Sequence, residues 1–334
     1  MIPANHPADP APIEKRLLGQ TPLMVSRAVL GTMTFGSQVD AETAGKMVDL
    51  CHERGVNFID TANVYNSGRS EDIVGAVLRG RRDQFVLATK AGIRVGESPD
   101  DTGLSKAAII KALEASLRRL QTDYVDLFYL HQPDPATPLE ESLSAVEELV
   151  RAGKVRHVGA SNFAAWQHCK MLGLNERGVG PRVNVGQPMY NLFARGIEQE
   201  FLPACRALGI ATVVYNPLAG GLLTGKQKSE SPLPGTRFAQ SEAYRNRYWR
   251  AENFDAVREL SAAAAQQGRS LISLSLNWIF HHTPVDCVII GASSLTQLEQ
   301  NLRALGDGPL AAETLAECDR IWDGLRGPSP KYNR

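Results

Sequence analysis

Four ionisable side chains stand at the ends of short apolar segments, or in the loop after one, in the first part of the chain. Asp60 ends NFID, Tyr65 lies five residues further on, Lys90 ends FVLATK and His131 ends DLFYLH. A lysine beside a tyrosine stabilises the phenolate and lowers a pKa that starts near 10, which suits a tyrosine that donates a proton. Asp60 would keep Lys90 charged, and His131 would hydrogen-bond a carbonyl oxygen beside the tyrosine hydroxyl. The four residues therefore predict a site that acts on a carbonyl group.

Each of these residues has an ordinary structural alternative when it is taken alone. An aspartate after a strand commonly caps a helix, and a buried tyrosine commonly packs in a core. Metal ligation is a weaker alternative, because the sequence has no HExxH motif and no paired His or Cys spacing. The adjacent His281 and His282 fit the end of a helix better than a pair of ligands. We therefore expect no metal.

The elements that position these residues alternate along the chain. Short runs rich in β-branched or aromatic residues are separated by longer amphipathic segments, which is typical of parallel strands joined by helices. Eight such runs occur: AVLGT, NFID, QFVLATK, YVDLFYLHQ, KVRHVGASN, RVNVGQ, IATVVYNP and DCVIIGAS. The pattern predicts a (β/α)8 TIM barrel of the α/β class, in which strand ends meet at one rim and bring the four residues together.

The sequence predicts one domain with short tails. KRLLGQTPLMVS contains two short extended pieces around Gly19 and Gln20, which predicts an N-terminal β-hairpin that closes the bottom of the barrel. We expect a flexible N-terminal tail at residues 1–14, the barrel at residues 15–325 and a C-terminal tail at residues 326–334. Long βα loops are expected at the C-terminal face, including residues 92–104 and 224–250.

The overall composition excludes several classes of function. Thirty-six basic residues balance thirty-six acidic ones, so no global field favours nucleic acid or an anionic membrane. The five cysteines are scattered without a CxxC pair, which is typical of reduced intracellular thiols. No apolar run approaches the roughly 18 residues of a membrane span, and the first residues lack a hydrophobic signal core. We expect a cytoplasmic protein; neither heptads nor an apolar stripe decides its oligomeric state.

Several motifs in the same order resemble the aldo-keto reductase superfamily, especially its potassium-channel β-subunit-like branch. The resemblance runs from Lys15 to about Leu305. It rests on GTMTFG at residues 31–36, FIDTANVYNSGRSE at 58–71, the lysine at 90, YVDLFYLHQPD at 124–134 and GKVRHVGASNF at 153–163. The resemblance implies that Tyr65 is the proton donor, that Lys90 and Asp60 tune it, and that His131 orients the carbonyl.

The resemblance also implies a nicotinamide cofactor that the barrel loops hold. No GxGxxG motif follows the first strand, which disfavours a doubly wound dinucleotide fold. Residues implied near the nicotinamide are Thr32, Met33, Gln38, Asp60, Ser161, Asn162, Gln187 and the stacking platform Tyr215. Those implied around the pyrophosphate are Asn216, Pro217, Leu218, Gly220, Lys226 and Arg237. Those implied at the adenosine end are Gly291, Ser293, Gln297, Gln300 and Asn301.

Two positions bear on which cofactor is used. Branches with a strong NADPH preference often carry Lys or Arg where this chain has Gly291 and Gln297. Serines precede the helix that follows the last strand, and the helix N-terminus there favours an anion such as a ribose phosphate. We expect NADPH, with NADH as an alternative. Ser161, Asn162 and Gln187 have loop capping as their structural alternative.

The expected activity is NAD(P)H-dependent reduction of an aldehyde, ketone or sugar carbonyl to the alcohol, with a small-molecule carbonyl or alcohol as substrate and neither nucleic acid nor membrane as partner. The same residues would also serve an alcohol or sugar dehydrogenase, because the reaction is reversible. A further alternative is a redox-sensing subunit with marginal turnover, against which the intact His131 argues. A barrel enzyme of unrelated chemistry would require the cofactor motifs to be coincidental. Four aromatic residues could line a substrate wall or pack in the core, namely Phe35, Trp166, Tyr190 and Trp249.

Overall fold

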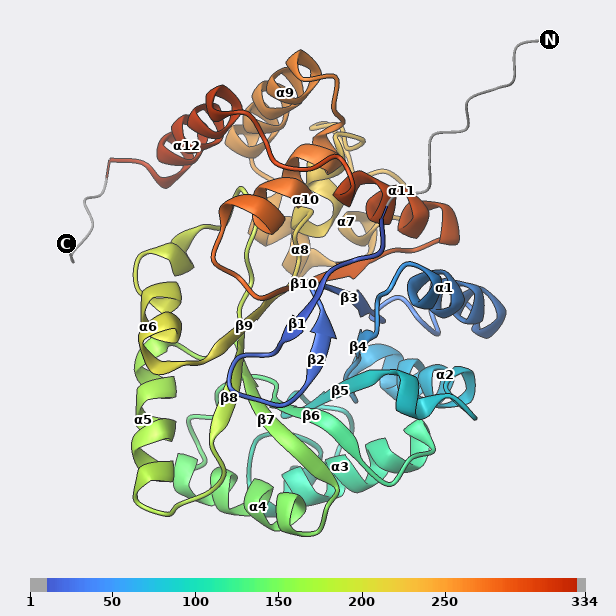
Figure 1. The fold of residues 1–334 in the computed structure, drawn as a ribbon, viewed down its shortest axis with the longest axis vertical. Coiled ribbons are helices and arrows are strands. Elements are labelled where there is room, and N and C mark those ends of the chain that lie inside the picture. The colour runs from blue at the N-terminus through green and yellow to red at the C-terminus, as the bar shows by residue number, and fades with distance from the viewer. Residues whose placement is uncertain (1–10, 329–334) are drawn as a thin grey trace.

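Eight parallel strands close into a barrel in the computed structural model, which describes residues 11–328 (Figure 1). Around the barrel they are β3 (Ala28–Gly31), β4 (Phe58–Asp60), β5 (Val86–Ala91), β6 (Val125–Leu130), β7 (Val155–Ser161), β8 (Val183–Gln187), β9 (Ala211–Val214) and β10 (Cys287–Gly291). Strand β10 pairs with both β9 and β3, which completes the closure. The predicted (β/α)8 barrel is confirmed.

The strands are buried along most of their length because both of their faces are covered. Every residue of β5 and of β6 is buried, and apolar residues fill most of their positions without alternation; the charged exceptions are Lys90 in β5 and Asp126 in β6. Side chains that point outward pack under the helices, while those that point inward fill the barrel. Polar side chains at the carboxyl ends of the strands therefore all reach one rim.

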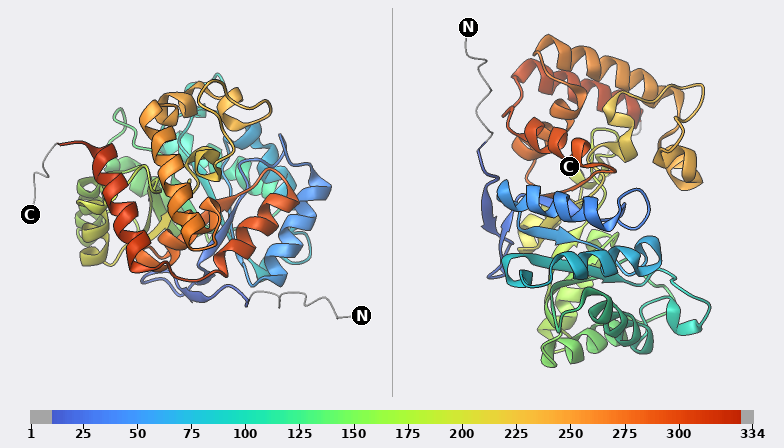
Figure 2. Two further views of the ribbon diagram at one scale, coloured as in Figure 1. Left: turned by 90° about the horizontal axis from the view of Figure 1, so that it is seen from above. Right: turned by 90° about the vertical axis from the view of Figure 1, so that its right-hand side faces the viewer.

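Helices surround the barrel (Figure 2). They are α1 (Ala41–Glu53), α2 (Arg69–Val77), α3 (Lys106–Leu120), α4 (Leu139–Arg151), α5 (Ala165–Glu176), α6 (Phe201–Leu208), α7 (Arg237–Gln240), α8 (Glu242–Tyr248), α9 (Ala251–Gln266), α10 (Leu271–His282), α11 (Leu295–Leu305) and α12 (Ala312–Arg326). Local sequence sets several of the ends. The Ser105 hydroxyl accepts a hydrogen bond from the N–H of Ala108 at the start of α3, and Gly209 ends α6 with φ of 65°.

The predicted hairpin is present and covers the end of the barrel where the strands begin. Strands β1 (Lys15–Leu17) and β2 (Met24–Ser26) are antiparallel, and they lie across the barrel in Figure 1. Leu18 and Val25 belong to the same apolar cluster as the inward-pointing residues of the barrel, including Phe58 and Leu127. The bottom of the barrel is thus sealed with apolar side chains, and the opposite rim is left for polar chemistry.

The long βα segment predicted at residues 224–250 follows β9, and it contains two short helices, α7 and α8, that the sequence did not predict. Both helices are too short for periodicity to reveal them, and tertiary burial stabilises them instead. Phe238 is fully buried, and its ring lies 5.2 Å from the ring of Trp249. The Trp249 ring in turn packs edge-on against Phe254 at the start of α9, at 4.9 Å between centroids. These aromatic contacts fold the segment back over the rim.

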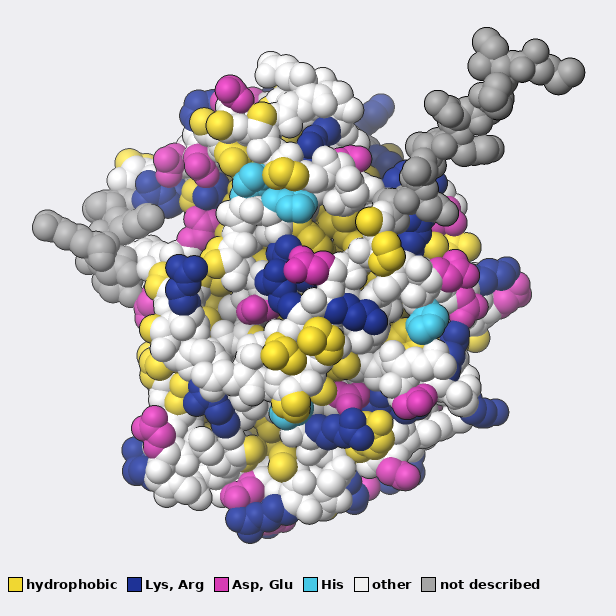
Figure 3. Space-filling model, viewed as in Figure 1, with side chains coloured by type: hydrophobic (Ala, Val, Ile, Leu, Met, Phe, Trp, Pro, Cys, Tyr) yellow, Lys and Arg dark blue, Asp and Glu magenta, His cyan; other side chains and the backbone are white. Residues whose placement is uncertain are grey.

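The surface carries charges of both signs. On the face that bears the hairpin, basic and acidic side chains are interspersed without a region of one sign (Figure 3). None of the helices between residues 11 and 328 is long and apolar enough to cross a membrane. Of the predicted tails, residues 1–10 and 329–334 lie outside the described residues. Ile13 is described, and its N–H donates to the carbonyl of Arg54 at 2.8 Å.

Candidate active site

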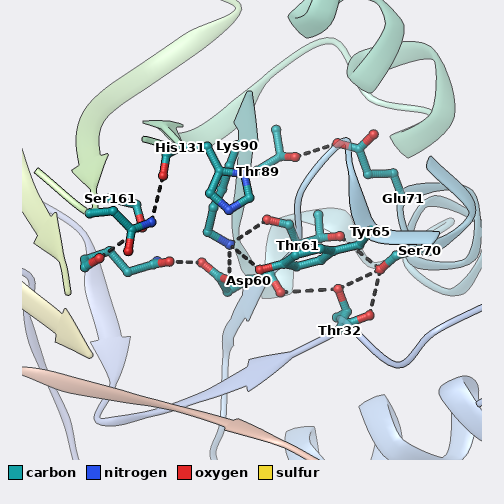
Figure 4. Close-up of polar contacts among 12 residues, drawn as sticks. Thr32, Asp60, Thr61, Tyr65, Ser70, Glu71, Thr89, Lys90, His131 and Ser161 are labelled. Atoms are coloured by element: carbon teal, nitrogen blue, oxygen red, sulfur yellow. Dashed lines mark hydrogen bonds and ion pairs between the residues drawn. The ribbon is translucent and has the colours of Figure 1, made fainter. Parts of the chain in front are cut away.

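The ammonium group of Lys90 is buried at the rim and surrounded by three oxygen atoms (Figure 4). It forms an ion pair with Asp60, donates to the carbonyl of Thr61 at 2.9 Å, and lies 3.4 Å from the hydroxyl of Tyr65. The second carboxylate oxygen of Asp60 accepts a hydrogen bond from Gln187 Nε2 at 2.9 Å. An ammonium has three N–H groups, so each of them has a partner.

Burial and charge act in opposite directions on the Lys90–Tyr65 pair. Burial is the largest single influence and would lower the pKa of Lys90, but the Asp60 carboxylate and Tyr65 together outweigh it and raise that pKa above its ordinary value. The ammonium is therefore charged at neutral pH. For Tyr65, burial raises the pKa and the positive charge of Lys90 only partly opposes this. The expected net lowering of the tyrosine pKa was wrong in sign, because desolvation of the phenolate exceeds the attraction of Lys90.

His131 lies beside Tyr65 with its ring edge-on, at 6.1 Å between the ring centroids. Its backbone N–H donates to the carbonyl of Ala91 at 2.8 Å, which fixes it directly after β6. Burial, with a contribution from the charge of Lys90, lowers the pKa of His131 to about 3. The imidazole is therefore neutral at physiological pH. Its Nδ1 atom is buried without a hydrogen-bond partner among the described residues, which leaves Nε2 as the nitrogen available to a ligand.

A single cavity of about 880 Å³ opens over these residues. Asp60, Tyr65 and His131 line it, whereas Lys90 lies behind the wall and acts through its two neighbours. Every residue predicted to hold the cofactor also lines this cavity: Thr32, Met33, Gln38, Asp60, Ser161, Asn162, Gln187, Tyr215, Asn216, Pro217, Leu218, Gly220, Lys226, Arg237, Gly291, Ser293, Gln297, Gln300 and Asn301. The structure thus brings the catalytic and cofactor candidates to one continuous space.

The polar side chains after β7, β8 and β9 form a connected group. Asn162 donates to the carbonyl of His131 at 2.9 Å, and its amide oxygen accepts from the hydroxyl of Tyr215 at 2.7 Å. Ser161 donates to the backbone carbonyl of Gln187 at 2.9 Å. These bonds hold the ring of Tyr215 at the cavity wall, where it can serve as a stacking platform. The same bonds are the loop-capping contacts that were the structural alternative for Ser161 and Asn162.

Two other predicted cofactor residues bond to the protein itself. The amide oxygen of Asn216 accepts from the N–H of Gly220 at 2.6 Å, and its nitrogen donates to the hydroxyl of Tyr248 at 2.8 Å. Gln38 donates to the carbonyl of Gly235 at 2.8 Å and so links the loop after β3 to the long segment after β9. Both side chains line the cavity and shape it.

The far end of the cavity has the features that an anionic group requires. Lys226 and Arg237 line it, and neither forms an ion pair within residues 11–328. The guanidinium of Arg237 lies 4.9 Å from the centre of the Tyr244 ring. Helix α11 begins here behind Ser294, and Gln297 accepts hydrogen bonds from the backbone and hydroxyl of Ser293 at 3.1 and 2.9 Å. Cations without an ion-pair partner among residues 11–328 and a helix N-terminus, in the lining of one cavity, fit a phosphate-bearing nucleotide.

Sequence reasoning missed several residues of the cavity wall. Tyr244 and Arg247 reach it from α8, and Asn66, Ile93 and Gln132 reach it from the loops after β4, β5 and β6. The aromatic and basic residues of the YRNRYWR segment could have identified Tyr244 and Arg247 as residues of the cavity wall. The four aromatic residues considered for a substrate wall do not line this cavity. Phe35 and Tyr190 are buried in the core, and Trp166 is exposed.

Comparison with known proteins places the chain in a family. The model of the aldo/keto reductase family matches residues 27–323, so the chain belongs to this family, whose members generally use NAD(P)H. A human protein named aflatoxin B1 aldehyde reductase member 2 is 39% identical over 325 residues, which cover 92% of this chain and 89% of that protein. A probable voltage-gated potassium channel subunit beta of Arabidopsis thaliana is 38% identical, covering 88% and 91% of the two chains. The uncharacterized oxidoreductase YrpG of Bacillus subtilis is 36% identical, covering 96% and 99%.

The family and these relatives establish an oxidoreductase that acts on small-molecule carbonyl compounds. They establish the class of reaction and not the residues that carry it out.

Proposed function

We propose that this protein is an NADP(H)-dependent reductase that converts an aldehyde, ketone or sugar carbonyl to the alcohol, with Tyr65 as the proton donor. The observation that carries the proposal is the buried Lys90 ammonium, whose three partners include the Tyr65 hydroxyl at the wall of a large cavity. A buried charge is costly unless it serves a purpose or is fully paired. Here the pairing directs one N–H group at the residue proposed to give up a proton.

The residues of the chain would divide the work as follows. The reduced nicotinamide, when bound, supplies the hydride for the carbonyl carbon. The neutral imidazole of His131 and the hydroxyl of Tyr65 both face the cavity and would hydrogen-bond the carbonyl oxygen, where negative charge develops. Tyr65 would then transfer its proton to that oxygen, and Lys90 would stabilise the resulting tyrosinate. Because the pKa of His131 is far below neutral, this residue orients the carbonyl and does not donate the proton.

The cofactor would lie along the cavity from the catalytic residues to α11. Tyr215 would stack on the nicotinamide ring, and Ser161, Asn162 and Gln187, which line the same cavity, would hydrogen-bond its carboxamide. Lys226 and Arg237 supply positive charge for the phosphates. We propose that NADPH is preferred over NADH. Because Gly291 and Gln297 at the adenosine end supply no cation, we expect the difference between the two affinities to be modest.

Two alternatives rest on specific observations. An alcohol or sugar dehydrogenase would use the same residues in the opposite direction, with Tyr65 accepting the proton. A cofactor-binding subunit that reports redox state is supported by the potassium channel β-subunit relatives.

Titration of the protein with NADPH and with NADH, followed by the fluorescence of the nicotinamide, tests the cofactor. A panel of aldehydes, ketones and sugars, read at the absorbance of the reduced cofactor, then tests the activity. We expect tighter binding of NADPH and oxidation of the cofactor that depends on a carbonyl compound. Equal affinities would refute the cofactor preference. Tight binding without turnover across the panel would favour the redox-sensing alternative.

A further inference from the structure

We propose that Asn66 and Ser70 are positioning residues that hold the Tyr65 hydroxyl against Lys90, one from each side of the loop between β4 and α2. This inference rests on the proposed function, because it assumes that Tyr65 donates the proton. Asn66 and Ser70 themselves are not among the residues predicted to hold the cofactor.

The loop that carries Tyr65 has an unfavourable backbone. Asn66 has φ of 52° and Ser67 has φ of 57°, and Gly68 follows with φ of 88°. A non-glycine residue in this left-handed region costs roughly 1–2 kcal/mol, and asparagine tolerates it better than serine does. Such a conformation persists only where surrounding contacts hold it. The loop would therefore relax, and carry Tyr65 with it, if those contacts were removed.

Asn66 provides the contact next to Tyr65. Its amide nitrogen donates to the carbonyl of Met33 at 2.9 Å and to the carbonyl of Phe35 at 2.6 Å. Both acceptors belong to the turn after β3, and the ring of Phe35 is fully buried in the core. The two N–H groups of one side chain thus tie the loop to a rigid neighbour.

Ser70 provides the contact on the other side of the loop. Its hydroxyl donates to the carbonyl of Thr32 at 2.8 Å and lies 2.8 Å from the hydroxyl of Thr32 and 3.1 Å from that of Thr61. All three residues are fully buried, and Figure 4 shows their hydroxyl groups gathered beside Tyr65. The carbonyl of Thr61 accepts a hydrogen bond from Lys90 at 2.9 Å. Ser70 therefore contacts the side chain of Thr61, the residue whose carbonyl orients the ammonium.

The hydrogen bond between Lys90 and the Tyr65 hydroxyl, which Asn66 and Ser70 help to maintain, is the weakest of the three that Lys90 makes. The distance from its Nζ atom to the Tyr65 hydroxyl is 3.4 Å, near the limit for a hydrogen bond, whereas the distance to the Thr61 carbonyl is 2.9 Å. A further displacement of Tyr65 would break the contact. The tyrosine would then lose the charge that lowers its pKa and stabilises its conjugate base.

Replacement of Asn66 by glycine tests the role of the side chain. Glycine adopts a positive φ freely, so Asn66→Gly removes both hydrogen bonds without backbone strain. Ser67→Gly is the matched control, because this exposed neighbour has the same backbone conformation and does not line the cavity. Ser70→Ala is an independent second variant on the other side of the loop.

We expect Asn66→Gly and Ser70→Ala to lower kcat by at least about tenfold while KM and the Kd for NADPH change less than about twofold. The basic limb of the kcat–pH profile should move to higher pH, because Tyr65 without Lys90 has a higher pKa. In the protein without cofactor, amide hydrogen exchange across residues 61–70 should be faster in Asn66→Gly than in Ser67→Gly. Ser67→Gly should keep the parent kcat and pH profile.

Unchanged kcat and pH profile in both Asn66→Gly and Ser70→Ala would overturn the inference. An equal loss in Ser67→Gly would also overturn it, since backbone freedom alone would then explain the effect. Tyr65→Phe, assayed alongside, separates this inference from the proposed function. An inactive Tyr65→Phe with a normal Asn66→Gly refutes only the positioning role, whereas a fully active Tyr65→Phe refutes the proton-donor mechanism itself.

Discussion

The ion pair between Asp60 and Lys90 allows stability and catalysis to be separated. Their side chains are only 2% and 1% exposed, so removal of either charge leaves the other buried and unpaired. Such a change typically costs about 3–5 kcal/mol, whereas replacement of a whole buried pair by neutral groups of similar volume is often close to neutral. We expect Asp60→Asn and Lys90→Met each to lower the free energy of unfolding by about 3–5 kcal/mol. The double variant should lie within about 2 kcal/mol of the parent.

Urea unfolding of the four proteins, followed by circular dichroism, measures this cycle. The coupling free energy between the two sites should be at least about 4 kcal/mol. Carbonyl-dependent turnover should be lost in Lys90→Met and should stay lost in the double variant although its stability returns. Additive destabilisation in the double variant would refute the reasoning, because the two charges would then not be compensating each other.

Three further predictions concern the histidines and the barrel interior. The kcat/KM profile should be flat between about pH 5 and 8, because His131 has a pKa of about 3 and stays neutral throughout; a titration near pH 6.5 would contradict this. His168 is buried, and neither of its ring nitrogens has a hydrogen-bond partner within residues 11–328. Burial lowers its pKa to about 4, so as the pH falls below about 6.5 the unfolded state takes up the proton before the folded state does. His168→Leu should therefore recover about 3 kcal/mol of unfolding free energy at pH 4 relative to its effect at pH 7.5, and an equal effect in urea melts at both pH values would contradict this. Gly159→Ala should destabilise the barrel by about 1–3 kcal/mol, because its Cβ would lie 2.4 Å from the ring of Tyr129; an unchanged melting temperature would contradict this.

The barrel and its rim could be predicted from the sequence because both follow from simple periodicity. Strands covered on both faces are rich in consecutive apolar residues, so the sequence showed roughly where these strands end. Asp60 and His131 stand directly at such ends, and Lys90 lies one residue before the end of β5. In a (β/α)8 barrel the carboxyl ends of all strands meet at one rim, so these three residues lie together whatever the exact bounds of the helices are.

Other features depend on contacts that a sequence does not display. The positive φ of Asn66 and its hydrogen bonds to the turn after β3 are set by tertiary packing. The sequence alone therefore offered no indication that this residue positions Tyr65. Helices α7 and α8 depend on the burial of Phe238 and Tyr248. The direction of the Tyr65 pKa required knowledge of how deeply its hydroxyl is buried, since neighbouring charge and desolvation oppose each other.

The central claim is that Tyr65 supplies the proton, and comparison of Tyr65→Phe with the parent protein tests it most directly. The variant keeps the ring and loses only the hydroxyl. With the best carbonyl substrate of the panel, we expect kcat to fall by about 10²- to 10⁴-fold, while the Kd for NADPH stays within about twofold. A kcat equal to that of the parent protein would contradict the account.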